Sequence, residues 1–313
     1  MKAIILCAGL GTRLKSLTDR LPKPLMPIVG RPIIENIIYS LKHCGIQEIV
    51  INTHHLQGKI VDYLKDGKKF EIKVHYSHEP QTLGTGGGIG NVRDFFKGHE
   101  PFIAHNGDVL TNLNLAPAIK AHIDTQAMAT LLLCDFPPIN TVTLASSGEV
   151  VGIKGTAREP KDSDLERLTF TGISIMNPEI LEFLPRREYG DIVDTYLKLI
   201  GIKRGSIRGY VVKNHYWRHI GNISEYFRVH QEILIEKERL IYGKAPSPEP
   251  FYIGEGSIIE EGVLLRGFVS MGRDCVIKRG ATLENCIIWD RITVEGDEVL
   301  RNVILGNGMK IPC

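Results

Sequence analysis

Hydrophobic and polar positions in the first half of the chain alternate between two patterns. Short apolar runs at residues 3–6 and 48–52 are typical of buried strands. Between them, residues 31–45 carry isoleucine and leucine on one face at helical spacing, with Pro32 suited to a first turn and Gly45 to the stop. Strands separated by helices of about ten residues predict a doubly wound, mainly parallel α/β sheet.

The ligand of such a sheet binds at the carboxyl ends of its strands. Three turns occupy such ends in this sequence, at residues 9–13, 79–88 and 106–108. We therefore expect a binding site that is assembled from these three turns, although they are far apart along the chain.

The pattern changes beyond residue 240. Residues 241–250 are rich in proline, lack an apolar period and are predicted to be a linker. From residue 253, an aliphatic or large apolar residue leads each of seven successive six-residue units. A period of six with inward-facing leaders predicts a short left-handed parallel β-helix over residues 251–313, separate from an α/β domain at residues 1–240. The leaders are Ile253, Ile259, Leu265, Met271, Ile277, Leu283 and Trp289.

The six-residue repeat also argues against one enzyme class. Hexapeptide β-helices often belong to acyltransferases, which need a base, usually histidine, to deprotonate the acceptor. All 11 histidines of this chain lie at or before His230, so an acyltransferase site in the repeat is disfavoured. We expect the repeat to be a scaffold or an oligomer contact, and the protein to be a homo-oligomer formed through it.

Composition excludes further classes. With 43% hydrophobic and 24% charged residues, the 313-residue chain is ordinary for a globular protein, and its net charge of +2 provides no basic field for nucleic acid. It has no apolar run of about 18 residues, and its six scattered cysteines form no CxxC motif. Its first residues run straight into a predicted strand, so we expect no secretory leader. We expect a cytoplasmic protein with no disulfide framework, no membrane span and no nucleic-acid partner.

The first of the three turns, Gly9-Leu10-Gly11-Thr12-Arg13, fits neither common phosphate-binding motif. Leu14 stands where a dinucleotide fold needs a third glycine, and the second strand ends in Asn-Thr-His at 52–54 instead of an acidic residue. The Gly-Lys-Ser/Thr of a P-loop is absent as well. What remains is a turn whose backbone N–H groups can approach an anion, near the cations Arg13 and Lys23. A ligand-free tight turn and a solvated lysine are the alternatives.

Residues 6–38 (LCAGLGTRLKSLTDRLPKPLMPIVGRPIIENII) resemble, almost position by position, the signature of the sugar-1-phosphate nucleotidyltransferases, which include the mannose-1-phosphate guanylyltransferases. Residues 83–92 resemble the base-recognition turn of that family, and residues 105–113 its metal-binding turn. Residues 168–181 and 216–226 resemble two later family segments, and a hexapeptide tail is common in the guanylyl branch. The resemblance covers essentially the whole chain and implies a Rossmann-like, doubly wound mixed sheet of the nucleotide-diphospho-sugar transferase type.

The resemblance implies that the protein joins a sugar 1-phosphate to the α-phosphate of a nucleoside triphosphate and releases pyrophosphate. A phosphate monoester has a second pKa of about 6, so the nucleophile is largely dianionic at neutral pH and needs no general base. Arg13 and Lys23 would hold the triphosphate and the leaving group, with the amides of Gly9, Leu10, Gly11 and Thr12 around the phosphates. Asp108 would bind Mg²⁺ between the reacting phosphates. Arg13, Lys23 and Asp108 are the expected catalytic residues.

The choice of base is expected to fall to the second turn, with Glu79, Gly84 and Thr85 as nucleotide-binding residues. The Glu79 carboxylate can accept hydrogen bonds from the N1 and amino groups of guanine, which uracil cannot offer. Glu79 thus favours guanine modestly, and the resemblance to the guanylyl branch makes GTP with mannose 1-phosphate the favoured substrate pair. UTP or dTTP with another hexose or heptose phosphate is the alternative.

The sugar phosphate is expected at Gly107, Glu159 and Gly172. The Glu-Lys-Pro motif of the family is represented at best by Arg158-Glu159-Pro160. Because this motif is degenerate, the identity of the hexose cannot be predicted from it.

One position departs from the family pattern. His219 stands where the family usually carries the aspartate that completes the metal site with the residue matching Asp108. Neutral imidazole suits Mg²⁺ poorly, because Mg²⁺ prefers oxygen ligands. Three explanations stay open: a preference for Mn²⁺ or Co²⁺, Mg²⁺ held by Asp108 and the phosphates alone, or a catalytically weak, nucleotide-sugar-binding regulatory paralogue.

Overall fold

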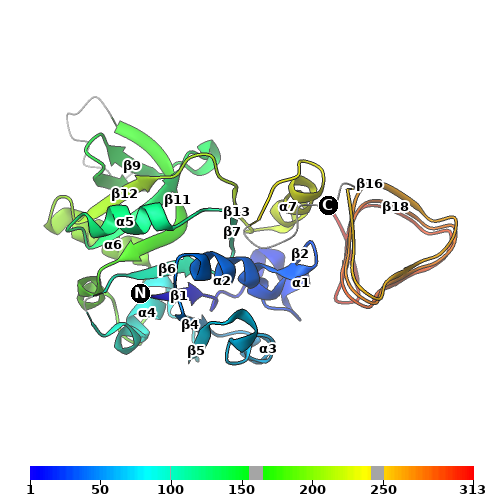
Figure 1. Cartoon of the computed structure of the whole chain (residues 1–313), viewed down its shortest axis with the longest axis horizontal. Helices are drawn as coiled ribbons and strands as arrows, with labels where there is room; N and C mark the ends of the chain where they lie inside the picture. The colour runs from blue at the N-terminus through cyan, green and yellow to red at the C-terminus, as the bar shows by residue number, and fades with distance from the viewer. Residues whose placement is uncertain (99, 155–164, 241–249) are drawn as a thin grey trace.

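The computed structural model describes residues 1–98, 100–154, 165–240 and 250–313. A mixed sheet with its helices fills the first part of the chain, and the C-terminal residues form a stack of short strands beside it (Figure 1). Glu159 and the predicted linker, apart from Pro250, lie outside the described residues. Within the described part of the chain, no helix is both long enough and apolar enough to cross a membrane.

Nine strands of the described residues form the main sheet, in the order β10-β9-β11-β6-β1-β4-β5, with β8 pairing β11 and β12. The central strand β1 runs parallel to β4 and β6, whereas the long strand β11 runs antiparallel to β6, β8 and β9. The sheet is therefore mixed. Its strands are β1 (Lys2–Leu6), β4 (Glu48–Thr53), β5 (Lys73–His78), β6 (Phe102–Asn106), β8 (Ala129–Cys134), β9 (Val142–Ala145), β10 (Val150–Ile153), β11 (Leu165–Met176) and β12 (Ile207–Val211).

Successive residues of β1 pack into two different cores. Ala3 and Ile5 belong to one cluster of buried side chains and Ile4 to another. Because successive side chains of a strand point to opposite faces, both faces of the sheet are covered, which explains the unbroken apolar run in the sequence. The helices are α1 (Lys15–Thr18), α2 (Ile33–His43), α3 (Gln57–Leu64), α4 (Gly84–Asn91), α5 (Ala116–Ile123), α6 (Ile192–Ile202) and α7 (Ile223–Leu234).

The helix predicted over residues 31–45 is confirmed as α2. It begins after Pro32, and Gly45, with a φ of +80°, follows its end. Its apolar stripe is fully buried. The short connecting elements are the 3₁₀ turns η1 (Thr12–Leu14), η2 (Lys23–Leu25), η3 (Lys68–Phe70), η4 (Arg93–Phe96), η5 (Pro137–Ile139) and η6 (Pro178–Phe183), and the two-stranded ribbons β2 (Pro27–Ile28) with β3 (Arg31–Pro32) and β7 (Val109–Thr111) with β13 (Trp217–His219).

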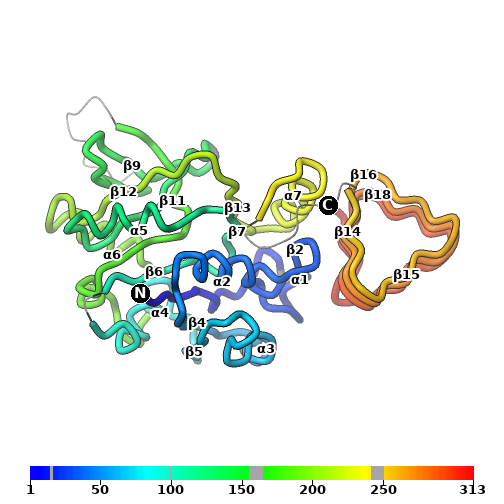
Figure 2. The backbone as a smooth tube through the Cα atoms, viewed as in Figure 1, coloured from blue at the N-terminus to red at the C-terminus, as the bar shows by residue number. Residues whose placement is uncertain are grey.

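Residues 251–313, called here the C-terminal coils, form two parallel stacks of strands. One stack has the order β14-β16-β18-β20 and the other β15-β17-β19. Ile253 pairs with Met271 and Leu265 with Leu283, so that neighbouring strands lie three repeat units apart. Viewed in Figure 2, successive coils overlie one another and outline a triangle. The strands are β14 (Phe251–Ile253), β15 (Ile258–Ile259), β16 (Leu264–Met271), β17 (Val276–Ile277), β18 (Thr282–Ile288), β19 (Thr293–Val294), β20 (Val299–Gly306) and β21 (Met309–Pro312).

The inward positions of the six-residue pattern are buried in the middle of the stack. Met271, Ile277 and Leu283 are completely buried, whereas the first two leaders, Ile253 and Ile259, are 38% and 37% exposed. β14 and β15 lie at the ends of their stacks, whereas β21 runs antiparallel along β20 and pairs with its edge. The open edge on the side of the first coil leaves these leaders less covered.

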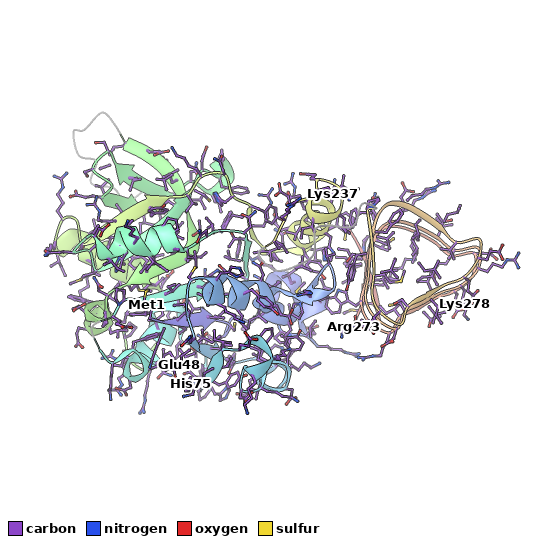
Figure 3. All side chains as sticks on the ribbon, viewed as in Figure 1. Met1, Glu48, His75, Lys237, Arg273 and Lys278 are labelled. Carbon is purple, nitrogen blue, oxygen red and sulfur yellow. The ribbon has the colours of Figure 1, made fainter. Side chains whose placement is uncertain are left out.

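The C-terminal coils pack directly on the α/β part through α7, which lies between the two (Figure 1). The rings of Phe227 and Phe268 have centroids 5.0 Å apart. Side chains from both parts fill this junction; Arg273 lies on the corner of the coils nearest the α/β part, and Lys278 on the far corner (Figure 3). Trp289 and Ile304 belong to the same buried cluster as β1. The coils therefore share a core with the rest of the chain.

Candidate active site

The glycine turn follows the central strand β1 and is fixed from within. The carbonyl oxygen of Gly11 accepts hydrogen bonds from the Leu14 N–H at 2.8 Å and from the Thr18 hydroxyl at 3.1 Å. Gly11 has a φ of +64°, and a Cβ there would lie 3.0 Å from Cγ2 of Thr18, so glycine is required. At Gly9, in contrast, no atom lies within 4 Å of the Cβ position. Space beside the backbone at Gly9 is therefore open to a ligand.

Lys23 lies in the 3₁₀ turn η2 with a proline on each side. Its side chain is only 10% exposed, and its Nζ lies 2.5 Å from Oδ2 of Asp108. The alternative of a solvated surface lysine is therefore wrong. Arg13 is exposed, and its guanidinium lies beside Gly221. A Cβ placed on Gly221 would be 3.4 Å from Nη1 of Arg13.

Asp108 is held at the end of β6 by backbone contacts on both sides. The Gly107 N–H donates to the Leu6 carbonyl at 2.9 Å, and the Ile220 N–H donates to the Asp108 carbonyl at 3.0 Å. A Cβ on Gly107 would lie 2.6 Å from the Leu6 oxygen, so only glycine allows this approach. The two bonds fix the Asp108 side chain where β1, β6 and β13 meet.

His219 lies in β13, opposite Val109 in β7. Its Nε2 is 3.1 Å from Oδ2 of Asp108, the same oxygen that Lys23 contacts. Burial alone raises the pKa of Asp108, but the His219 hydrogen bond and the Lys23 charge outweigh it and hold that pKa well below its usual range. Asp108 is therefore a carboxylate at neutral pH. Trp217 of the same strand instead donates its Nε1–H to the Thr171 carbonyl at 3.0 Å.

Glu79 does not face the cavity, which corrects the expectation that it contacts the base. It is 0% exposed. Its Oε1 accepts from the Asn52 amide at 2.7 Å, and its Oε2 accepts from the Leu83 N–H at 2.9 Å. Asn52 in turn accepts from the Cys7 N–H at 2.7 Å. This buried chain of hydrogen bonds joins the glycine turn to the second turn, so Glu79 fixes the shape of the turn.

The second turn opens into helix α4, whose glycines allow close packing. A Cβ on Gly87 would clash with the Glu188 carbonyl oxygen, so this close approach requires glycine. The Thr85 hydroxyl donates to Oδ1 of Asp191 at 3.2 Å and accepts from the Ile192 N–H at 2.9 Å. Lys154 Nζ lies 3.6 Å from Oδ2 of Asp191. Asp191 therefore links the second turn to α6.

A cavity of about 210 Å³ opens between the three turns, and a second of about 170 Å³ adjoins it. Gly9, Lys23 and Asp108 line both. The first is lined further by Leu6, Cys7, Ala8, Pro24, Asn52, Thr82, Gly84, Thr85, Asn106 and Gly107. The second is lined further by Gly11, Thr12, Arg13 and Gly221. The structure thus brings together residues that the sequence places in three separate turns.

Other expected site residues lie at the margin. Leu10 is 48% exposed and does not line either cavity. Gly172 in β11 has a φ of +81°, and a Cβ there would lie 2.7 Å from the Asn106 amide nitrogen, so Gly172 supports a cavity-lining residue from behind. Glu159 lies outside the described residues.

Sequence reasoning missed Asn52, Cys7 and Asp191. Asn52 was noted only because it is not acidic, yet its position at the end of the second strand signalled a place in the site. Cys7 lines the cavity, and burial, with a smaller effect of Asp108, raises the pKa of its thiol far above the usual range. A thiol that stays protonated is a poor nucleophile. Nothing in the sequence placed Asp191 beside Thr85.

The donor atoms near Asp108 suit a metal that is partly held by substrate. No group of three or more histidine, cysteine, aspartate or glutamate side chains is arranged to hold a metal among the described residues. Asp108 and His219 form a pair instead. Mg²⁺ is commonly bound by one or two carboxylates together with phosphates and water. The single carboxylate of Asp108 fits that pattern, and the imidazole fits softer ions better.

Comparison with known proteins shows which chains and folds this protein resembles. A family model described as nucleotidyl transferase matches residues 2–236. A UTP–glucose-1-phosphate uridylyltransferase of Synechocystis sp. is 28% identical over 93% of this chain and 83% of its own length. A mannose-1-phosphate guanylyltransferase of Mycobacterium tuberculosis is 27% identical over 95% and 82%. The crystal structure of a Bacillus anthracis protein described as a candidate glucose-1-phosphate thymidylyltransferase, in complex with sucrose, superposes with a TM-score of 0.63 at 26% identity, covering 78% of this chain and 98% of that one.

Proposed function

The chain belongs to the nucleotidyl transferase family, and from this premise we propose that it transfers a nucleotidyl group from GTP to mannose 1-phosphate. An oxygen of the sugar phosphate forms a bond to the α-phosphorus, the bond between the α- and β-phosphates breaks, and pyrophosphate leaves with the electron pair. The product is a nucleoside diphosphate sugar.

One observation carries the proposal. Lys23 and Asp108 form an ion pair in the wall that two adjoining cavities share, next to the open backbone of Gly9. A cation, a carboxylate and exposed backbone at one point are what two reacting phosphates and a metal ion require. In the proposed reaction the sugar phosphate is the nucleophile, so no side chain has to attack. The raised pKa of Cys7, which keeps its thiol protonated, agrees with this.

The catalytic roles follow from charge. Two anions must be aligned and the charge on the transferring group and the leaving pyrophosphate neutralised. We assign the triphosphate to Arg13, Lys23 and the backbone of Gly9, Gly11 and Thr12, because these line the smaller cavity. The amide of Leu10, in the same turn, stays a proposed phosphate contact. Asp108 would hold Mg²⁺ with His219 beside it, and the ion, when bound, would neutralise phosphate charge. Lys23, released from Asp108 by the incoming phosphates and metal, would then contact the triphosphate.

The larger cavity is the proposed place of the nucleoside and the sugar phosphate. Gly84 and Thr85 line it and are proposed to contact the base, with Glu79 holding their turn from behind. Gly107 lines it as well and is proposed to approach the sugar phosphate. Gly172 supports this region through Asn106, and Glu159 remains a proposed sugar-phosphate residue.

Two alternatives have specific support. The relatives carry names with uridylyl, guanylyl and thymidylyl transfer, so UTP or dTTP with another hexose or heptose phosphate is the first. The second alternative is a catalytically weak regulatory protein that binds nucleotide sugars. The presence of His219 in place of a second carboxylate favours this alternative. Both alternatives keep the same cavity.

A substrate panel tests these proposals. Pyrophosphate release is measured for ATP, GTP, UTP and dTTP against several sugar 1-phosphates, with Mg²⁺ and with Mn²⁺. We expect the highest kcat/KM for GTP with mannose 1-phosphate. The control variant Asp108→Asn is expected to release no pyrophosphate with any pair. A higher kcat/KM for another pair establishes the first alternative. Nucleotide-sugar binding without pyrophosphate release from any pair establishes the second.

We propose the division into residues 1–240 as the catalytic domain, 241–250 as a linker and 251–313 as a left-handed β-helix. The parallel pairing of strands three repeat units apart supports the β-helix. A homo-oligomer formed through it and a cytoplasmic location stay predictions.

A further inference from the structure

Lys23 lies in the segment of residues 17–30. The C-terminal coils contact this segment at its first residue, Leu17. The Asn307 side-chain amide, in the turn between β20 and β21, donates to the Leu17 carbonyl at 2.7 Å. Leu17 precedes Thr18, whose hydroxyl donates to the Gly11 carbonyl in the phosphate turn. The Asn307 side chain of the last coil is therefore connected to Gly11 of the proposed triphosphate site through Leu17 and Thr18.

A second contact reaches the other side of Lys23. The Trp289 indole, a donor only, gives its N–H to the Tyr226 hydroxyl at 3.0 Å. The Tyr226 hydroxyl in turn donates to the Pro27 carbonyl at 2.6 Å, and Tyr226 is fully buried. The direction of both hydrogen bonds is fixed by Trp289, so each strengthens the other in this dry junction. Pro27 lies four residues after Lys23.

A third contact lies at the end of the segment. Gly30 has a φ of +80°, and a Cβ there would clash with the Tyr252 ring of the first coil strand β14. Leu25 and Ile28 also belong to the same buried cluster as Ile287 of the coils, so the segment and the coils share one core. The segment of residues 17–30 is thus held near both ends by residues after 250, and at Pro27 by Tyr226 of α7, which Trp289 of the coils orients.

Inside the segment, short backbone hydrogen bonds connect these contacts to Lys23. The Met26 N–H donates to the Lys23 carbonyl at 3.0 Å, and the Leu25 N–H to the Pro22 carbonyl at 2.8 Å. The prolines on both sides of Lys23 fix their own φ angles and leave little freedom between the contacts. A shift at Pro27 is therefore transmitted to the Lys23 backbone.

We propose that the C-terminal coils position the phosphate-binding segment, with Asn307 and Trp289 as positioning residues that act on Lys23 through the backbone. This rests on the proposed function for what Lys23 binds, but the mechanical link between coils and segment does not. The coils are then more than a scaffold or oligomer contact. Removal of the coils is then expected to lower the affinity for nucleotide even in a monomer, where no oligomer contact is involved.

Two full-length variants with matched controls test the link. Asn307→Gly removes the amide donor and tolerates the φ of +54° at that position, and Tyr226→Phe removes only the hydroxyl between Trp289 and Pro27. Asn302→Gly is the control in the same coil, where φ is +49° and the side chain bonds Asn285. Tyr196→Phe is the control for a buried hydroxyl, which bonds Ser174.

Hydrogen exchange over residues 17–30, affinity for nucleoside triphosphate by calorimetry, and the KM for that substrate are measured. The net contribution of one hydrogen bond corresponds to a change of about two- to tenfold in an equilibrium constant. We expect exchange to be faster and nucleotide affinity lower by that factor in Asn307→Gly and Tyr226→Phe, with the KM for the sugar phosphate and both controls unchanged. Unchanged exchange overturns the link, and faster exchange with unchanged nucleotide affinity overturns the positioning role. Absence of turnover in the wild type counts against the proposed function only, because exchange and affinity are still measured.

Discussion

The Nζ of Lys23 lies 2.5 Å from Oδ2 of Asp108, although the two residues are 85 positions apart. The pair joins the segment proposed to bind triphosphate to the turn proposed to bind metal. His219 contacts the same carboxylate oxygen. The charge balance of the site therefore rests on three side chains.

Lys23→Ala and Arg13→Ala are each expected to lower turnover by about a hundredfold or more, the size seen for loss of a preorganised contact to developing charge. Steady-state pyrophosphate release of the purified variants measures this. Lys42→Ala, which removes a surface lysine paired with Glu71, is the control and is expected to be near wild type. Near-normal turnover in a folded Lys23 or Arg13 variant removes that residue from the mechanism.

His219→Asp is expected to raise Mg²⁺-dependent turnover, because it supplies a hard oxygen ligand beside Asp108. The wild type is expected to prefer Mn²⁺ or Co²⁺, which accept nitrogen more readily. Turnover of both proteins is titrated with each ion. The ligand hypothesis is rejected if the metal preference and the Mg²⁺ turnover of the variant both equal those of the wild type.

Glu79→Gln is expected to lower stability without switching the base. Both carboxylate oxygens accept hydrogen bonds, and an amide has only one acceptor oxygen, so one buried donor loses its partner at a cost of about 1–3 kcal/mol. Urea unfolding measures the loss, and the GTP-to-UTP ratio of kcat/KM is expected to change by less than about threefold. Glu261→Gln on the exposed coil surface is the control. A reversed base preference would show that Glu79 contacts the base after all.

Stability is expected to fall as the pH falls below about 6.5. Burial lowers the pKa of His230 to about 3 and that of His105 to about 4, so below the ordinary value the unfolded chain binds protons that the folded chain does not. Each residue then contributes up to about 1.4 kcal/mol per pH unit, until its folded pKa is reached. His230→Gln, whose amide can still donate to Pro27, is expected to flatten the urea-unfolding profile between pH 7 and 5. The exposed His43→Gln is the control, and equal slopes in the His230 variant and the wild type contradict this account.

The oligomer is expected to form at the first coil rather than the last. On the last coil β21 pairs with part of the edge of β20 and β19 ends its stack, whereas on the first coil both β14 and β15 end their stacks. Ile258 and Leu264 on this edge are 57% and 50% exposed. Replacing both by lysine is expected to give a monomer in light scattering, and Val299→Lys, exposed on β20, is the control. A monomeric wild type would falsify the oligomer prediction.

Features that depend on local pattern could be predicted from the amino-acid sequence alone. The apolar runs and helical spacing predicted β1 and α2, the glycine and proline positions marked the turns, and the six-residue period predicted stacked strands beyond residue 250. The resemblance of the turn motifs to the family signature singled out Arg13, Lys23 and Asp108. These signals are carried by residues that are close along the chain, where backbone geometry and side-chain spacing suffice.

The contacts between the turns depend instead on how distant segments pack in the folded chain. The tertiary structure buried Glu79 behind the second turn through Asn52, although the charge of a glutamate suggested an exposed contact. It brought Asp191 to Thr85 and Trp289 to Tyr226 across distances in sequence that no local pattern spans. Burial and hydrogen-bond partners depend on which distant segments pack together, and that packing is set by the whole core rather than by any one stretch of the chain.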